Sequence, residues 1–130
     1  MKRARFALVP LLALAAAVLP NVYVSAGNRS DGPSPGTRLV PFNLSNTGPV
    51  SAEKAQIDSI TGIAVLSRGS GTVSLLTVLP VAVGTIAPGK TAGANLLFVW
   101  PPEADRVRLV VAYSANGGTY KGSTGLTLSR

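Results

Sequence analysis

Few side chains in this chain could carry acid–base or metal chemistry. Cysteine and histidine are absent, and the only carboxylates are Asp31, Glu53, Asp58, Glu103 and Asp105. Without thiol or imidazole groups, a cysteine nucleophile, a histidine base and a Cys/His metal site are excluded. A serine nucleophile would need a lysine as its base.

The carboxylates do not form a pattern typical of catalysis. A glycosidase needs two carboxyl groups that face each other, but Glu53 and Asp58 fall at the start and middle of one expected strand. Glu103 and Asp105 share a loop beside Arg106, and this short stretch offers fewer than the six to eight oxygen ligands that Ca²⁺ requires. We expect solvated charges here, and a protein that is not an enzyme and holds no metal or cofactor.

The basic residues are scattered along the sequence. The formal net charge is +7 at pH 7, but Lys2, Arg3 and Arg5 belong to an N-terminal segment that is expected to be removed. Among the remaining cations, only Arg106 and Arg108 stand close together. A nucleic-acid-binding protein clusters its cations and places aromatic residues among them. This sequence does neither, so we expect no nucleic-acid partner.

The N-terminus has the layout of an export signal. Residues 1–5 carry three cations, residues 6–19 are apolar and uncharged, and Pro20 ends the run. Val24-Ser25-Ala26 offers short side chains before a cleavage site, which predicts cleavage between Ala26 and Gly27. The mature protein would then be secreted or periplasmic, with no stable membrane span. An uncleaved anchor over residues 6–28 is the alternative.

The remaining sequence predicts an all-β fold. Residues 27–37 are rich in Gly, Pro and Ser and are expected to form a flexible leader. From residue 38 to 130, short apolar runs alternate with turn signals, and no helical period is sustained. About seven strands are expected, at residues 39–45, 55–65, 72–79, 81–86, 94–100, 106–113 and 120–128. The alternation of the second strand slips between Ile57 and Ile60, as at a bulge, and residues 68–71 and Asn116-Gly117-Gly118 are turn signals. This spacing favours an antiparallel, immunoglobulin-like β-sandwich.

Two stretches resemble a known group of modules. Val40-Pro41-Phe42-Asn43-Leu44 leads into an Asn46-Thr47-Gly48 turn, and Gly84-Thr85-Ile86-Ala87-Pro88-Gly89-Lys90 precedes an alternating strand. Both are similar to bacterial extracellular immunoglobulin-like modules of the CARDB type. The resemblance covers residues 38–130 and implies a β-sandwich without shared catalytic residues.

We therefore expect an exported interaction or structural module of the cell envelope or extracellular space. An edge strand would pair with an unknown envelope or secreted protein, or loops at one end of the sandwich would bind that protein. Two edges are predicted, one at residues 40–44 because Pro41 cannot donate to a ladder, and one at the final strand. The alternation of Leu96, Phe98 and Trp100 places Trp100 in the core. If its ring instead faces outward, Trp100 is a candidate partner contact, as are Arg106 and Arg108. The alternative is a small carbohydrate-binding protein that stacks sugars on exposed aromatic rings such as Trp100, Tyr113 and Tyr120.

Overall fold

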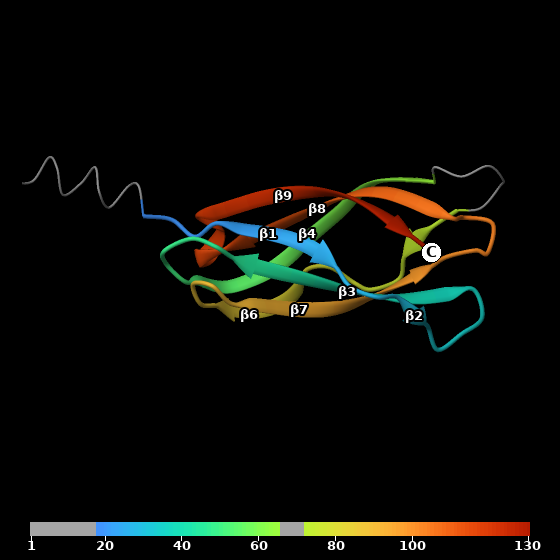
Figure 1. Ribbon diagram of the computed structural model, residues 1–130, viewed down its shortest axis with the longest axis horizontal. Coiled ribbons are helices and arrows are strands. Elements are labelled where there is room, and N and C mark those ends of the chain that lie inside the picture. Colours follow the sequence, from blue (N-terminus) through green and yellow to red (C-terminus); the bar gives the residue numbers. More distant parts are fainter. Residues whose placement is uncertain (1–17, 66–71) are drawn as a thin grey trace, which may run out of the picture.

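The computed structural model describes residues 18–65 and 72–130, and over these residues the chain is an antiparallel β-sandwich (Figure 1). One sheet has the strand order β1-β3-β7-β5, with β2 also paired to β3, and the other has the order β6-β4-β8-β9. The predicted all-β sandwich is confirmed. The strands are β1 (Val22–Ala26), β2 (Ser30–Asp31), β3 (Thr37–Asn46), β4 (Ala52–Val65), β5 (Ser74–Leu75), β6 (Val81–Ile86), β7 (Thr91–Val99), β8 (Arg106–Ala115) and β9 (Tyr120–Ser129).

Alternating apolar residues of the two sheets meet in a single core. On β8, the burial pattern alternates strictly from Arg106 to Val111, because successive side chains point to opposite faces of a strand. The ring of Phe42 on β3 packs against that of Phe98 on β7, with centroids 6.2 Å apart. The predicted inward residues of these strands are buried: Val40, Phe42, Leu44, Leu96, Phe98, Val107, Leu109, Val111 and Tyr113.

The turns follow their sequence signals. Lys90 N donates to Ala87 O over 3.0 Å, and Gly89 between them has φ 75°, as the third residue of a type II turn requires. Asn116 and Gly117, both with positive φ, begin the turn η1 (Asn116–Gly118) between β8 and β9. The predicted slip in β4 is also present, as a register shift between Ile57 and Ser59.

The expectation that β3 is an edge strand is wrong. β3 lies inside its sheet, with β7 on one side and both β1 and β2 on the other. Pro41 O accepts a hydrogen bond from Gly27 N at 2.8 Å, so the proline nitrogen also faces that side. β1 ends at Ala26 and β2 begins at Ser30, which leaves a gap in the ladder on this side of β3. Pro41, which has no backbone N–H, faces this gap, so the sheet loses no hydrogen bond there.

The folded unit begins earlier than the expected boundary at residue 38. β1 and β2 belong to the sandwich, and Val22 and Val24 of β1 are buried. The expected flexible leader, residues 27–37, contains β2, which pairs with Leu39 and Arg38 of β3. The charged and apolar parts of the export signal up to residue 17, and the expected turn at residues 68–71, lie outside the described residues.

Candidate functional site

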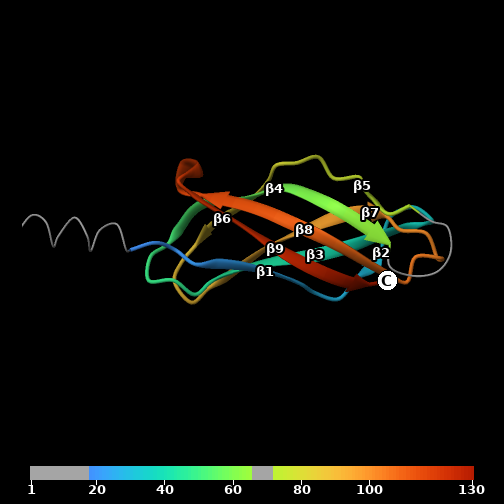
Figure 2. The same ribbon diagram turned by 90° about the horizontal axis from the view of Figure 1, so that it is seen from above.

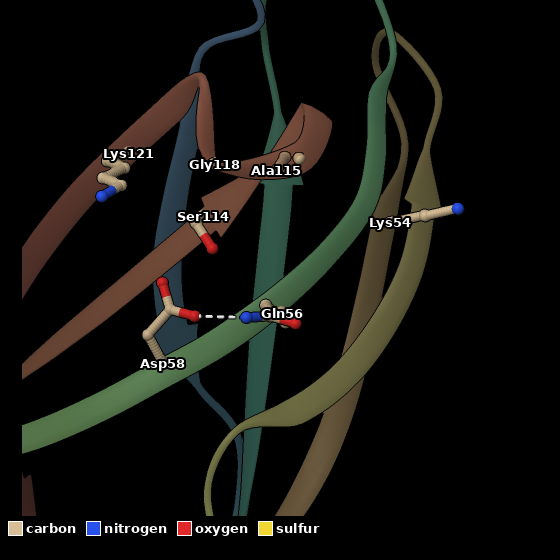
Figure 3. Close-up of a pocket in the computed structure, with 8 residues that line it drawn as sticks. Lys54, Gln56, Asp58, Ser114, Ala115, Gly118 and Lys121 are labelled. Atoms are coloured by element: carbon tan, nitrogen blue, oxygen red, sulfur yellow. Dashed lines mark hydrogen bonds between the residues drawn. The ribbon is translucent and has the colours of Figure 1, made fainter.

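A polar pocket of about 580 Å³ lies at the β8–β9 hairpin end of the second sheet. The strand register places Gln56 of β4, Ser114 of β8 and Lys121 of β9 in one row across the sheet. Gln56 Nε2 donates to Asp58 Oδ1 at 2.6 Å. A dashed line marks this bond between the two lining residues in Figure 3. The lining residues are Lys54, Gln56, Asp58, Ser114, Ala115, Gly117, Gly118 and Lys121.

Irregular backbone creates this hollow. The register shift after Ile57 is a bulge, and a bulge redirects side chains. Lys54 has φ 49°, a left-handed conformation that a lysine adopts only at a cost of about 1–2 kcal/mol. Strained residues of this kind gather at functional sites. The pocket can therefore accept a small polar group through its amide, carboxylate, hydroxyl and ammonium groups.

The sequence signals for the pocket were present but lay apart. The slip near Ile57 and the Asn116-Gly117-Gly118 turn were both recognised, yet only the β4–β8 pairing brings them together. Ser51 and Lys54 also stand at the Ser-x-x-Lys spacing. In Figure 3, the Lys54 side chain points away from Gln56 and Asp58. Residues 52–54 belong to the start of β4, so the spacing does not lie on a helix.

The second candidate site is the outer edge of β9. β9 pairs with β8 over ten consecutive residues without a register shift, and no described strand pairs with its other side. Arg130 N donates to Asp105 O at 2.8 Å, which fixes the alternation of the ladder. The N–H and C=O groups that point outward therefore belong to the odd-numbered residues: Lys121, Ser123, Gly125, Thr127 and Ser129.

Trp100 does not fit its predicted role as a partner contact. Its side chain is 1% exposed, and its Nε1 donates to Ala104 O at 2.7 Å. The ring packs edge-on against Phe98, with centroids 6.4 Å apart. Trp100 continues the inward row of β7, as its alternation with Phe98 had already indicated. It is a core residue, and no sugar or protein partner can reach it.

Arg106 and Arg108 lie on the exposed face of β8, opposite Ser129 and Thr127 of β9. They are far along the sheet from the pocket, whose row begins at Ser114. The structure therefore places these two arginines beside β9, one strand in from its outer edge, whereas Trp100 lies in the core. Their position leaves them free to contact a chain that approaches β9.

Several of the carboxylates have local partners. Asp31 Oδ1 accepts from Arg38 Nη1 at 2.8 Å, and Glu53 Oε2 accepts from Thr85 Oγ1 at 3.0 Å. Within residues 18–65 and 72–130, no three acidic side chains gather in a group that could hold a metal ion. In the same part of the chain, no helix has the length and apolar character needed to cross a bilayer.

No known protein family and no curated protein sequence matches this chain. The resemblance to CARDB-type modules therefore stays a prediction.

Proposed function

We propose that this protein is an exported, non-enzymatic interaction module that binds another protein by adding a strand to the edge of β9. The observation that carries the proposal is the unpaired outer edge of β9, ten residues long and regular throughout. An extended chain can hydrogen-bond to such an edge through its backbone, while side chains on both faces add specificity.

The other edges of the sandwich are poorer templates. β5 has two residues and β1 has five, whereas β6 carries register irregularities and Gly84 with φ 98°. Natural proteins protect edges in these ways, or with charged residues and proline. β9 contains no proline, and its single charge, Lys121, lies near its start. An edge left this regular favours a role in pairing.

Backbone pairing gives a sharp test at Thr127. Its N–H points outward and does not bond to β8, so Thr127→Pro removes a donor only from the free edge. The exported, tagged protein is incubated with its own cell envelope, and bound protein is quantified by mass spectrometry. We expect Thr127→Pro to lose a stoichiometric partner that Thr127→Ala, the matched control, retains.

The arginines separate strand pairing from surface charge. Charge reversal of both Arg106 and Arg108 should leave capture of the partner protein largely intact. Their side chains lie on the face of the sheet, whereas an added strand would bind through the backbone edge of β9. Circular dichroism should show both proline and alanine variants folded. Loss of the partner on charge reversal, with full capture by folded Thr127→Pro, would show that binding is electrostatic and would reject strand addition.

The pocket supports a second candidate function, the binding of a carbohydrate. The Gln56 amide and the Asp58 carboxylate lie side by side there, and such groups suit sugar hydroxyls. Stacking by Trp100 or Tyr113 does not contribute, since both rings are buried. Calorimetric titration with envelope oligosaccharides tests this function. Binding that Asp58→Asn weakens and Glu53→Gln leaves unchanged would support it.

A further inference from the structure

The segment that would be lost by cleavage after Ala26 is built into the sandwich. All five residues of β1 pair with β3, from Val22 opposite Asn46 to Ala26 opposite Phe42. Val22 and Val24 point into the core and are only 4% and 3% exposed. Figure 2 shows β1 beside β9, so β1 also covers the junction between the two sheets. A mature chain that began at Gly27 would lack this strand.

Two tyrosines of the opposite sheet hold the backbone of Val22. Tyr113 Oη donates to Val22 O at 2.5 Å, and Val22 N donates to Tyr120 Oη at 2.8 Å. These bonds join residues more than ninety positions apart in sequence. Both tyrosines would lose their Val22 partner if β1 were removed.

The residues just before β1 are equally well placed. Asn21 N donates to the fully buried Asn46 Oδ1 at 3.2 Å, and Thr47 N donates to Asn21 O at 2.8 Å. A Cβ on Gly48 would lie 2.5 Å from Asn21 N and 2.8 Å from Leu19 O. Gly48 has no positive φ, so the close approach of this N-terminal backbone is what requires a glycine.

A cleavage site further upstream would keep all of these contacts. Ala15-Ala16-Ala17 places small residues at the −3 and −1 positions of the bond before Val18. Residues 6–14 then form an apolar segment of nine residues, within the usual length for a signal. Val18 and Leu19 are 44% and 54% exposed, so a new N-terminus there leaves the core covered.

We propose that the export signal is cleaved between Ala17 and Val18, and that β1 is retained as the first strand of the mature domain. The reaction is hydrolysis: water adds its hydroxyl to the carbonyl carbon of Ala17 and a proton to the nitrogen of Val18. The proposal rests on export, which is part of the proposed function. It replaces the predicted bond between Ala26 and Gly27.

The direct test is the N-terminus of the exported protein. The full chain is expressed in a bacterial host, the cells are fractionated, and exported protein is analysed by intact mass and N-terminal sequencing. We expect Val18 as the first residue. An exported protein with Gly27 or any other first residue would overturn the assignment of the bond, while export itself would stand. Protein found only inside the cell with Met1 retained would overturn both.

Matched substitutions test the two bonds separately. Valine is a poor residue at the −1 position of a signal but suits a strand. We expect Ala17→Val to accumulate unprocessed precursor, and Ala26→Val to be processed like the natural sequence. The reverse result would place cleavage after Ala26.

Gly48→Ala reports whether the segment before β1 stays docked after export. If the mature protein begins at Val18, the new methyl group meets the backbone of Asn21 and the melting temperature falls by several degrees. Gly36→Ala is a poor control because Gly36 has φ 78°, so Gly125, with open space around it, is substituted instead. An exported Gly48→Ala protein with an unchanged melting temperature would contradict retention of these residues.

Discussion

The first and last strands lie side by side at one edge of the sandwich, yet they are held in different ways (Figures 1 and 2). β1 is five residues long and is fixed from both sheets, by its ladder to β3 and by the tyrosines that bind Val22. β9 is twice as long and pairs with β8 alone. No described strand forms a ladder with its outward backbone groups.

The difference separates two roles for a terminal strand. β1 closes the fold, because its valines fill the core and its backbone satisfies polar groups of distant residues. β9 contributes Leu128 to the core on one face while keeping one backbone edge open. We infer that damage to β1 reduces stability, whereas damage to the outer edge of β9 reduces association.

Removal of β1 should have the largest effect. A chain that begins at Gly27 loses two buried valines, each contributing about 1.5–3 kcal/mol of burial. This is a large fraction of the ~5–15 kcal/mol that stabilises a typical domain. We expect a cooperative urea transition to shift to a much lower midpoint or disappear.

The control for this truncation is a chain that begins at Pro20 and loses only the exposed Val18 and Leu19 side chains. Its midpoint should stay near that of the chain that begins at Val18. A chain beginning at Gly27 with the same midpoint as the control would show that β1 does not close the fold.

Leu109→Ala should have the next largest effect. It changes a residue of β8, the strand to which β9 is paired. Leu109 is 1% exposed and pairs with Leu126 of β9. The substitution leaves a cavity and should lower the free energy of unfolding by about 2–5 kcal/mol. Chemical denaturation measures it. The neighbouring Val110→Ala changes a side chain on the outer face, and equal losses from both variants would contradict the inward row of β8.

Tyr113→Phe tests the clamp on β1 with a smaller change. The substitution keeps the ring and removes the hydroxyl that donates to Val22 O, leaving a carbonyl without this partner. We expect a loss of about 1–3 kcal/mol in the free energy of unfolding. Tyr23→Phe makes the same chemical change on a half-exposed ring of β1 and should be nearly neutral. Similar losses of unfolding free energy from both variants would show that the hydroxyl of Tyr113 does not hold β1 in place.

The two strands also show what the sequence could predict. β9, like β3, β7 and β8, alternates apolar and polar residues, so its existence and inward face follow from the pattern alone. β1 could not be separated from the apolar export signal that runs into it, because the residues that identify it, Asn46, Tyr113 and Tyr120, are distant in sequence. The prediction that Pro41 marks an edge strand was wrong for the same reason. Pro41 faces the gap between β1 and β2, and that gap is known only once both strands are placed beside β3.

The pocket was missed because its parts come from positions 54–58 and 114–121. Each part carried a local signal, a bulge and a turn, but the hollow arises only where the two meet. Long-range pairing, rather than the identity of any one residue, decides where polar groups gather on this outer face. The same holds for Trp100, whose burial depends on Ala104 and Phe98 together.

The smallest effect is expected at Arg29, in the link between β1 and β2. Burial, and then the charge of Arg38, lower the pKa of Arg29, so folding disfavours its charged form. When folding lowers the pKa of a base, the charged form of that base destabilises the folded protein. This cost disappears only as the pH rises through the pKa, which for arginine lies far above neutrality. Near neutral pH, the cost should therefore not vary with pH.

Arg29→Met keeps the length of the side chain and removes the charge, together with a buried Nε that has no hydrogen-bond partner. Because Arg29 Nη1 also donates to Gly27 O at 3.2 Å, the gain is partly offset, and we expect a small rise in melting temperature. Added salt should narrow the difference from the natural protein, since it screens the repulsion from Arg38. A clear fall in melting temperature would show that the bond to Gly27, which fixes the chain as it leaves β1, outweighs the cost of the partly buried charge.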